Sequence, residues 1–566
     1  MTLRMPKIWG QQIYLSELLA ERVESAPHAA RFFLYLAETL ELQLYKCFYM
    51  GAPRYNRPTL IAVILYAMYK GYFESEGIVQ FAGDSIGAQW ILNGMKMPGY
   101  KTVERTINDL LEELDDIFKQ ILSICEQLDL IGEKRVYIDG VKVQANASKH
   151  KAMSYEYLGK KIIRGKEDLK SLFAALKDVM TELGNEEQLQ DIALDDAAKV
   201  HKGLQEIHQK ALDTKQERIF NRDLEETECP LQSEKVEEER GVERIKSGLQ
   251  ILNRIEPEKQ DAAIETLNNM AFVHKRVSRM EAAKAELEKK WKAENGNKKI
   301  PNKQQINFTD SDSCIMQTKH HGVQQCYNNF ALVDYKANII LGTHTSNNPS
   351  DQLGLIPCIE NTEKTYGNLK GFQLGADAGF FSANNISYTT GKGIDFYASY
   401  PEAKSVYAKD KFKYDETTDT YTCPEGNSLT AQKQLKDGSI RQYSNEAACV
   451  LCNNCNACTK AKDGVRRIER DMENDKLRED AKVKASSAEG REILRLRKSV
   501  PEPVWGNIKI QDGFTQMHYR GIEKAGLEFD LHCLMQNIRK LLKVYYSSRS
   551  YQDTVHNICG SCMQTA

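Results

Sequence analysis

Apolar side chains recur at helical intervals through the first 130 residues of the chain. Leu60, Ile64 and Met68 are four positions apart, and Pro58 stands just before them. Proline is favoured in the first turn of a helix, because the N–H that it lacks has no intrahelical partner there. We therefore predict a helix that begins near Pro58.

A break at Pro98-Gly99 separates this helix from a second one. Thr102 is placed to cap the second helix, whose apolar positions run through Ile107, Leu110, Leu111, Leu114 and Ile117. With Lys101 and Arg105 near its start, the pair resembles a helix–turn–helix, a motif that places its second helix in the major groove of DNA. A plain helical bundle gives the same pattern, and the pattern alone favours it.

The pattern changes to strand character at residues 135–143, where Asp139 is followed by glycine. Charged helical sequence then fills residues 151–300. Heptad a and d positions within it, interrupted by Lys284, hold Met270, Val273, Val277, Met280, Leu287 and Trp291. This pattern predicts an antiparallel helical arm with a structural role, and a dimer contact is the alternative.

Short apolar runs bounded by turn residues continue after the arm. They predict strands at Phe330–Val333, Asn338–Thr343, Gln373–Asp377 and Ile394–Tyr397. Residues 334–337 form a hairpin turn between the first two, and a helix runs from Asp351, its cap, to about Thr362. This order predicts a mixed α/β core. The tail, residues 502–546, is helical with an apolar face of Leu531, Leu534, Ile538, Leu541 and Leu542.

The length and charge of the chain narrow the possible partners and location. Its 566 residues can bury several cores, and a net charge of −2 means that any nucleic acid must be met by local basic patches. No run approaches the ~18 consecutive apolar residues of a membrane span. Met1–Gln12 lacks the basic head and apolar core of a signal peptide, so we expect a cytoplasmic protein.

Five of the 14 cysteines crowd into residues 423–458. Cys449, Cys452, Cys455 and Cys458 are three residues apart, and Cys423 precedes them. Cys-x2-Cys spacing lets two thiolates hold one ion from a tight turn, so five thiols are offered for four tetrahedral places. A secreted disulfide scaffold would be shorter and more evenly crosslinked, which favours a reducing cytosol and one structural metal cluster. Free thiols without a metal are the alternative.

Three carboxylates stand in settings that suit metal binding. Asp139 and Asp377 each end a predicted strand, and Glu502 lies between two prolines where a helix can start. Such carboxylates can converge on a pair of Mg²⁺ ions, which prefer oxygen ligands and can contact both the attacking and the leaving oxygen of a phosphoryl transfer. Each carboxylate taken alone is weak evidence for a metal site, since an Asp before a Gly is most often a turn residue. Glu528, in the following helix, is a rival third carboxylate for which a structural role is favoured.

Four segments resemble motifs of bacterial insertion-sequence DDE transposases. Residues 137–148, Tyr-Ile-Asp-Gly-Val-Lys-Val-Gln-Ala-Asn-Ala-Ser, resemble the first-aspartate motif, and residues 376–386, Ala-Asp-Ala-Gly-Phe-Phe-Ser-Ala-Asn-Asn-Ile, the second. Residues 497–509, Arg-Lys-Ser-Val-Pro-Glu-Pro-Val-Trp-Gly-Asn-Ile-Lys, resemble the glutamate motif. Residues 309–334 resemble the segment that enters the central hairpin, and residues 51–131 the family's helical domain. The match is closest to the branch with a helical insertion after the first Asp and a Cys-rich insertion after the second.

The resemblance implies an α/β fold with an RNase H-like mixed-sheet catalytic core. It makes Asp139, Asp377 and Glu502 the ligands of two Mg²⁺ (or Mn²⁺) ions. It also implies a structural zinc ion held by Cys423, Cys449, Cys452 and Cys458, which leaves Cys455 spare.

The family's glutamate motif, Tyr-x2-Arg-x3-Glu-x6-Lys, is only partly kept. Lys509 matches the last position and shares a helix face with Glu502, because seven residues are close to two helical turns. Lys498 stands at the Arg position and Arg495 at the Tyr position. Expected DNA contacts come from phosphate-binding side chains and from the helical domain: Lys498, Lys509, Arg520, Lys101 and Arg105.

The implied function is cleavage of phosphodiester bonds at the ends of a mobile element and joining of the 3′-hydroxyl ends to target DNA. Its partners would be the terminal inverted repeats, target DNA and further copies of the chain. A catalytically decayed or domesticated DNA-binding protein is the alternative, supported only by the altered Tyr and Arg positions. The predicted domains are 1–130 (helical, DNA-binding), 131–150 (first strands), 151–305 (helical insertion), 306–405 (core), 406–465 (Cys-rich) and 466–566 (C-terminal helices).

Overall fold

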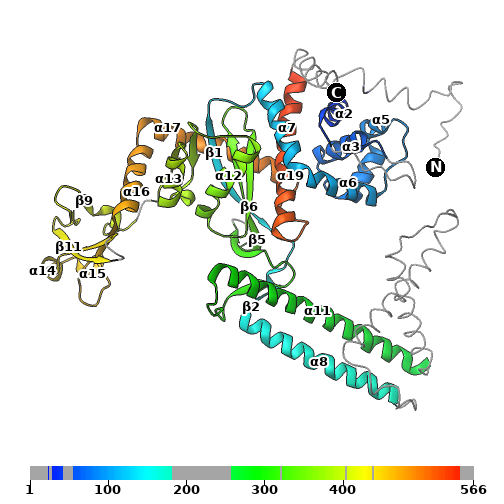
Figure 1. Cartoon of the computed structure of the whole chain (residues 1–566), viewed down its shortest axis with the longest axis horizontal. Coiled ribbons are helices and arrows are strands. Elements are labelled where there is room, and N and C mark those ends of the chain that lie inside the picture. The colour runs from blue at the N-terminus through cyan, green and yellow to red at the C-terminus, as the bar shows by residue number, and fades with distance from the viewer. Residues whose placement is uncertain are drawn as a thin grey trace. The chain divides into compact units, whose positions relative to one another are not determined.

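The computed structural model describes residues 23, 28–42, 55–181, 257–318, 322–401, 404–435 and 439–547. The chain divides into two compact units, one formed by Met1–Asn146 with Cys314–Ala566 and the other by Ala147–Ser313 (Figure 1). The segment tested for a signal peptide, Met1–Gln12, lies outside the described residues, as do large parts of the predicted domains 1–130 and 151–305.

Helices fill the described part of the chain before the first strand. They are α2 (Ala29–Thr39), α3 (Arg57–Tyr69), α4 (Ser75–Asp84), α5 (Ile86–Leu92), α6 (Tyr100–Glu112) and α7 (Leu114–Gln127). Helix α3 confirms the prediction at Pro58, which occupies its first turn, and Asn56 caps it by accepting a hydrogen bond from the Thr59 N–H (3.1 Å). Residues 60–68 of α3 are buried, so this helix is the centre of the group.

The predicted cap at Thr102 is wrong. Helix α6 begins three residues earlier than a cap at Thr102 would place it, with Gly99 in the capping position and no side-chain cap. Thr102 lies inside the helix, where its carbonyl accepts a hydrogen bond from the Thr106 hydroxyl (2.9 Å). The apolar run is also two helices and not one, because α6 ends at Glu112 and α7 begins at Leu114. Glu113, between the two helices, forms a buried ion pair with Arg57.

A six-stranded sheet forms the centre of the first unit. Its strands are β4 (Cys314–Thr318), β5 (Gly322–Asp334), β1 (Arg135–Gln144), β7 (Gln373–Ala376) and β8 (Asp395–Ala398) in spatial order, with β6 (Ile340–Ser346) also paired to β5. Strand β5 is antiparallel to β1, β4 and β6, whereas β1, β7 and β8 are parallel. The predicted hairpin and mixed α/β core are confirmed.

Helices of the first unit cover both faces of this sheet. They are α12 (Leu355–Thr365), α13 (Ala383–Gly391), α16 (Met472–Ala485), α17 (Ala488–Leu496), α18 (Pro501–Gln511) and α19 (Ile522–Ser547). Helix α19 contacts β6 and also α2, α3, α6 and α7, so it lies between the sheet and the N-terminal helices (Figure 1). Its predicted apolar face is confirmed, since all five of the predicted residues are buried.

The predicted cap at Asp351 is also wrong. Asp351 begins a short 3₁₀ turn, η4 (Asp351–Leu353), and Gly354 occupies the capping position of α12. The Asp351 carboxylate instead accepts a hydrogen bond from the Asn328 side chain (2.8 Å) on β5. This contact joins the helix entry to the central sheet.

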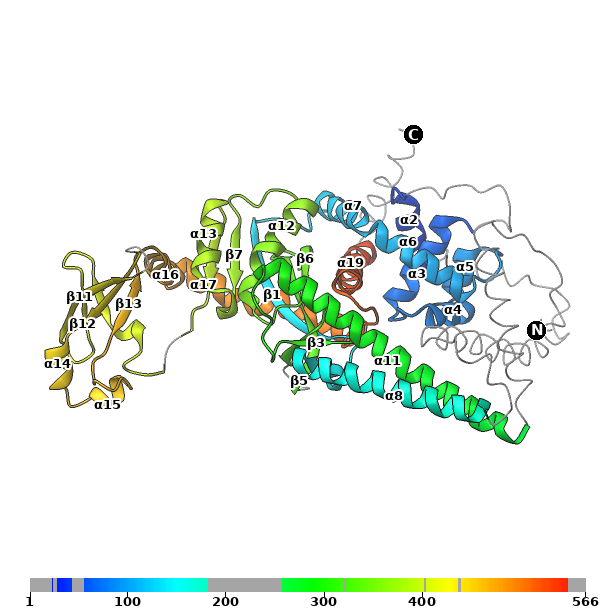
Figure 2. The same cartoon turned by 60° about the horizontal axis from the view of Figure 1, so that its bottom comes forward.

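The Cys-rich region forms its own antiparallel sheet. In spatial order its strands are β13 (Ile468–Asp471), β12 (Ile440–Ser444), β11 (Ser428–Leu435), β10 (Thr420–Thr422) and β9 (Lys413–Asp415). A small core of Phe412, Tyr421, Leu429, Tyr443 and Ile468 holds it together. Two short helices at one end, α14 (Glu446–Val450) and α15 (Cys455–Cys458), carry Cys449, Cys455 and Cys458 (Figure 2). The sheet runs to Asp471, six residues beyond the predicted boundary.

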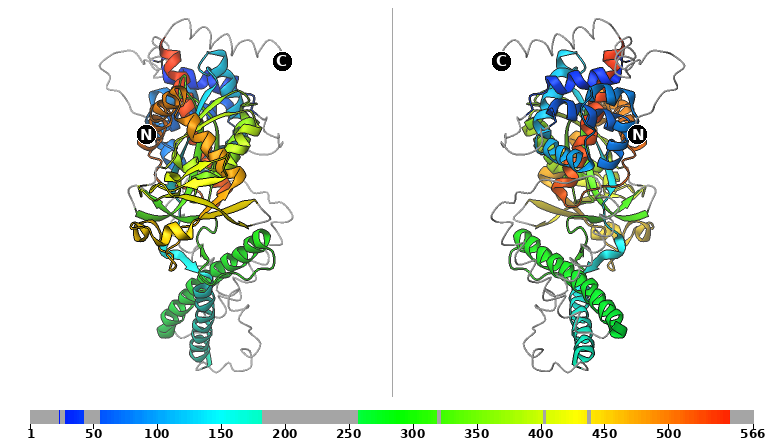
Figure 3. Two further views of the ribbon diagram at one scale, coloured as in Figure 1. Left: turned by 90° about the vertical axis from the view of Figure 1, so that its left-hand side faces the viewer. Right: turned by 90° about the vertical axis from the view of Figure 1, so that its right-hand side faces the viewer.

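The second unit contains the predicted antiparallel arm. Helix α8 (Tyr155–Thr181) packs along α11 (Pro257–Asn295), and β2 (Ala152–Ser154) pairs with β3 (Gln305–Asn307) at their base (Figure 3). Met270, Val277, Met280 and Leu287 are buried in the seam. Lys284, at the interrupting position, lies over the Tyr155 ring. No helix within the described ranges is long and apolar enough to cross a membrane.

Candidate active site and cysteine cluster

Asp139 and Asp377 lie side by side on neighbouring strands. Strands β1 and β7 are parallel, with Tyr137 opposite Gly375, so the same register continued by two residues brings Asp139 level with Asp377. Asp377 follows β7 directly, as predicted, whereas Asp139 does not end its strand, because β1 runs on to Gln144.

Gly140 is required by packing and not by a turn. It lies within β1, and a Cβ at this position would be 2.9 Å from the ring of Phe330 on β5. The Asp-Gly pair therefore marks a strand that approaches its neighbour closely, and the turn interpretation of this aspartate does not apply.

The Asp139 carboxylate is held at both oxygens. Oδ1 accepts a hydrogen bond from the Gly140 N–H (2.9 Å), and Oδ2 accepts one from the Trp505 indole N–H (3.1 Å). Burial and, to a smaller extent, the charge of Asp377 raise the pKa of Asp139 to about 6, against lowering contributions from the Gly140 hydrogen bond and from Arg497. Two carboxylates that destabilise each other's charge form a site that favours a cation.

Asp377 is fixed by the turn that follows it. Its Oδ1 accepts a hydrogen bond from the Gly379 N–H (2.8 Å) and caps a short 3₁₀ turn, η5 (Ala378–Phe380). A Cβ on Gly379 would lie 3.0 Å from carboxylate oxygens of both Asp377 and Asp351. Asp351 is thus a further acidic residue beside this site, which the sequence suggested only as a helix cap.

Helix α18 carries Glu502 in its first turn and packs against β1. The helix begins at Pro501, one residue before the glutamate. Trp505, one turn further on, is buried and reaches Asp139. Glu502 and Lys509 are exposed. The helix that bears the predicted glutamate therefore docks on the strand that bears the first aspartate.

The basic residues expected at DNA lie in different settings. Lys498 is exposed in η8 (Arg497–Ser499), before α18, as Pro501 indicates. Its neighbour Arg497 is the one whose charge acts on Asp139. Arg495 pairs with Glu492 on its own helix (2.8 Å).

The remaining expected DNA contacts are exposed on two other elements. Arg520 donates a hydrogen bond to the Asn146 carbonyl (3.0 Å), which ties its loop to the end of β1. Lys101 and Arg105 are exposed one turn apart on α6.

Glu528, the rival third carboxylate, holds a loop. It is buried in α19 and accepts hydrogen bonds from the His518 N–H (3.0 Å), the Tyr519 N–H (3.1 Å) and the His518 ring (2.6 Å). The charge of Glu528 and this ring contact raise the pKa of His518. All of these partners belong to the segment between α18 and α19.

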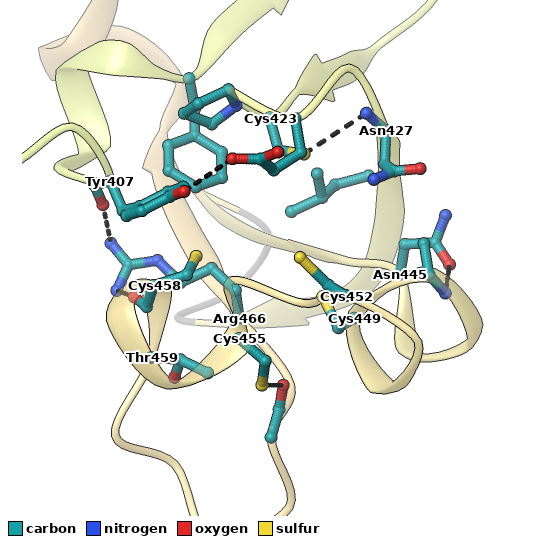
Figure 4. Close-up of a pocket in the computed structure, with 16 residues that line it drawn as sticks. Tyr407, Cys423, Asn427, Asn445, Cys449, Cys452, Cys455, Cys458, Thr459 and Arg466 are labelled. Carbon is teal, nitrogen blue, oxygen red and sulfur yellow. Dashed lines mark hydrogen bonds between the residues drawn. The ribbon is translucent and has the colours of Figure 1, made fainter.

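The five clustered cysteines line one cavity of about 30 Å³ (Figure 4). Cys455 is turned away, and its thiol donates to the Gly464 carbonyl (3.0 Å). The Cys423 sulfur accepts a hydrogen bond from the Asn427 N–H (3.3 Å). Burial raises the pKa of the Cys458 thiol, Arg466 lowers it, and Cys449, Cys423 and Cys452 raise it. Those three sulfurs thus lie near enough to Cys458 to interact with its charge.

Neither set of predicted ligands is gathered into a formed metal site. Within the described ranges, no three His, Cys, Asp or Glu side chains are grouped as ligands of one ion. The structure brings Asp139 and Asp377 together but leaves Glu502 exposed at the start of its helix. The aspartate oxygens are directed by Gly140, Trp505 and Gly379, and hydrogen bonds likewise direct Cys423 and Cys455.

Comparison with known proteins gives one match. A family model described as a transposase DDE domain matches residues 422–542. This segment includes Glu502, the five clustered cysteines and most of α19. It does not include Asp139 or Asp377, because both precede residue 422. No curated protein matches the chain. No solved structure matches it either.

Proposed function

We propose that the chain is a DDE transposase that cuts DNA at the ends of its mobile element and joins those ends to target DNA, because residues 422–542 match a transposase DDE domain. In the first step water attacks a phosphodiester, and the bond to the 3′ oxygen breaks to leave a 3′-hydroxyl and a 5′-phosphate. In the second step the 3′-hydroxyl attacks a phosphodiester of the target and displaces a new 3′-hydroxyl there. Both steps are phosphoryl transfers, so no external energy source is needed.

The observation that carries this proposal is the placement of Asp139 level with Asp377 on parallel strands, with the Glu502 helix docked on the first of them. The strand order β6-β5-β1-β7-β8, with β5 alone reversed, supports an RNase H-like core. The acidic residues fit Mg²⁺ or Mn²⁺, because hard cations prefer carboxylate oxygens and the Asp139–Asp377 pair is destabilised by its own charge.

Asp139, Asp377 and Glu502 would hold the ions. When bound, two such ions activate the attacking oxygen and stabilise the leaving oxygen. The chain's own residues orient these ligands: Gly140 and Trp505 direct Asp139, and Gly379 directs Asp377. Lys509, two turns along α18 from Glu502, is placed to contact a DNA phosphate.

We propose a structural zinc ion in the Cys-rich sheet, held by Cys423, Cys449, Cys452 and Cys458. The engagement of Cys455 with Gly464 supports its exclusion, and the proximity of the other three sulfurs to Cys458 supports their inclusion. Thiolates are the ligands that structural zinc prefers. The Cys-rich sheet has a core of only five buried side chains, so a metal crosslink would add to its stability.

DNA is the partner that a transposase domain implies. We propose that the helices within residues 1–130 recognise the element ends, and that the protein acts as an oligomer on DNA. Lys101 and Arg105 are the exposed basic pair on α6 that would face the DNA.

Strand cleavage of DNA that carries the inverted repeats flanking the element tests the proposed function. We expect the wild-type protein to cut in Mg²⁺ or Mn²⁺, and to bind without efficient cleavage in Ca²⁺, whose looser coordination places the oxygens poorly. Asp139→Asn and Asp377→Asn should each lower the rate about a thousandfold or more, since a metal supplies several kcal/mol of transition-state stabilisation. Cleavage that survives in both variants would disprove the carboxylate mechanism, and DNA binding without any cleavage would favour the decayed protein.

A further inference from the structure

We propose that Trp505 is a positioning residue of the active site, whose indole N–H sets the orientation of Asp139 for metal binding. This inference rests on the proposed function, because it assigns Trp505 a role toward the metal that Asp139 would hold. The sequence pattern shows Trp505 only as an apolar residue of a short helix, and its role follows from where α18 docks.

The contact joins two distant parts of the chain at the reacting centre. Trp505 Nε1 donates to Asp139 Oδ2 over 3.1 Å, although the two residues are 366 positions apart. The Gly140 N–H donates to the other oxygen, Oδ1, over 2.9 Å. With one donor on each oxygen, rotation of the carboxylate about its Cβ–Cγ bond is restricted. A carboxylate oxygen keeps a second lone pair while accepting one hydrogen bond, so Oδ2 remains able to bind a cation.

The indole is suited to this task and is itself held in place. Its N–H is a donor only, carries no charge and cannot ligate a metal, so it directs the carboxylate without competing for the ion. The ring is 8% exposed and stacks on Phe529 of α19, with ring centroids 5.9 Å apart and planes at 26°. Because the ring is fixed between β1 and α19, it fixes the carboxylate in turn.

The same contact sets the position of Glu502. Glu502 precedes Trp505 by three residues, so the two side chains lie on the same side of α18, one turn apart. The hydrogen bond from Trp505 therefore determines where this helix turn stands relative to Asp139. Residues that orient a metal ligand through a hydrogen bond typically account for about 10–100-fold in metal affinity or activity.

Two variants separate the hydrogen bond from the packing of the ring. Trp505→Phe keeps an aromatic ring against Phe529 but removes the N–H. Phe529→Leu weakens the ring stacking but leaves the N–H. Should Trp505→Phe fail to fold, benzothienylalanine at position 505, in which sulfur replaces the N–H, removes the donor with little change in shape.

The primary measurement is Mn²⁺ binding to the DNA-free protein, followed by the electron paramagnetic resonance signal of free Mn²⁺. We expect Trp505→Phe to raise the Mn²⁺ dissociation constant about tenfold. Phe529→Leu, which keeps the donor but holds the ring less firmly, should raise it by a smaller factor, and Ca²⁺-supported DNA binding should be unchanged in both variants. The Mn²⁺ concentration needed for half-maximal cleavage should rise in parallel. An unchanged dissociation constant in Trp505→Phe, or an equal loss in Phe529→Leu, would overturn the inference.

The proposed function fails in a different way. If Asp139→Asn binds Mn²⁺ as tightly as the wild type does, the metal site itself is misplaced. If Asp139→Asn loses Mn²⁺ binding and Trp505→Phe does not, only the role of Trp505 is wrong.

Discussion

Glu502 and Glu528 are the same residue type on consecutive helices, yet their surroundings are opposite. Glu502 is exposed, whereas Glu528 is 4% exposed and is the acceptor for the His518 and Tyr519 N–H groups. We expect Glu502→Gln to abolish strand cleavage with little change in melting temperature, because only a metal ligand is lost. Glu528→Gln should keep metal-dependent cleavage but lose about 1–3 kcal/mol of stability, since an amide cannot accept at both positions.

Cleavage and thermal melting measured on the same two variants decide this point. Loss of cleavage in Glu528→Gln at a temperature where it remains folded, with retention in Glu502→Gln, would move the third carboxylate to α19. The two variants change charge equally, so each serves as the control for the other.

Asp530 of α19 is a buried carboxylate outside the proposed active site. Burial and, to a smaller extent, the charge of Asp115 raise the pKa of Asp530 to about 7, against a lowering contribution from the hydrogen bond that the Thr343 hydroxyl donates to it. Because the folded state binds this proton more tightly than the unfolded chain does, its contribution to stability is full below about pH 4 and is lost as the pH rises to about 7. Asp530→Asn cannot ionise and keeps an oxygen for Thr343.

We therefore expect Asp530→Asn to gain stability over the wild type as the pH rises. At one pKa unit per about 1.4 kcal/mol, the difference should reach a few kcal/mol at most by pH 8 and be small near pH 4. Thermal melting of both proteins from pH 4 to pH 8 measures it. A difference between the proteins that stays constant across this range would show that ionisation of Asp530 is not responsible.

The position or role of a residue could be predicted where it depends on the neighbouring sequence. It could not be predicted where it depends on a contact with a distant part of the chain. The strand around Asp139 and the position of Asp377 after a strand follow from local pattern. Trp505 and Arg497 were missed because each acts on Asp139 only through the docking of the C-terminal segment on β1. Asp351 was noticed but given a capping role, since its partner Asn328 lies on another element.

The helices and strands show the same difference between features set by the neighbouring sequence and features set by distant contacts. Strong signals such as Pro58 at a helix start and the hairpin between β5 and β6 were confirmed. The caps at Thr102 and Asp351 were wrong, because a capping side chain needs backbone angles that the spacing of apolar residues does not determine. The break between α6 and α7 falls at Glu113, whose ion-pair partner Arg57 is remote in sequence.

The Cys-rich sheet offers a test of the zinc proposal within one element. Cys455 and Cys452 are three residues apart, but Cys455 donates to Gly464 while Cys452 lies near Cys458. We expect Cys452→Ser to lose bound zinc, because a hydroxyl is a poor ligand in place of a thiolate. Cys455→Ser should retain one zinc per chain, since its hydroxyl can still donate to the Gly464 carbonyl.

Elemental analysis of the purified variants measures this difference. Zinc retained in Cys452→Ser and lost in Cys455→Ser would exchange the roles of the two cysteines. Absence of zinc from the wild type, with all thiols titratable, would remove the metal from the proposal and leave the free-thiol alternative.

The sheet of the first unit is assembled from segments that are far apart along the chain. Strand β1 comes before the arm in the sequence and β4 to β8 come after it, so the segment of residues 147–313 that forms the second unit interrupts the sequence of the sheet between β1 and β4. Local pattern can find each strand but cannot say that β1 inserts between β5 and β7. The second unit spans Ala147–Ser313, whereas the predicted insertion spans residues 151–305.

The path of DNA along the protein can be tested through the salt dependence of binding. DNA that reaches the two aspartates must pass the end of β7 that Asp377 follows. Lys498 is next to Arg497, whose charge acts on Asp139, so we expect Lys498 to contact a phosphate of this DNA. Each phosphate that a lysine neutralises releases counterions, so log K falls with log[salt] by about 0.9 per contact. We expect Lys498→Ala to lower this slope by about 0.9 on any DNA sequence, while Lys101→Ala with Arg105→Ala should also reduce the preference for element ends.

Lys370 provides the matched control, because it is exposed and precedes β7, so it stands at the opposite end of that strand from Asp377. Lys370→Ala removes the same charge from the molecule but no expected phosphate contact. Binding measured by fluorescence anisotropy at several salt concentrations should therefore give the wild-type slope for Lys370→Ala. An equal change of slope in Lys370→Ala and Lys498→Ala would mean that net charge, and not a contact beside the active site, governs binding. An unchanged slope in Lys498→Ala alone would place the DNA away from η8 and require a different path to the two aspartates.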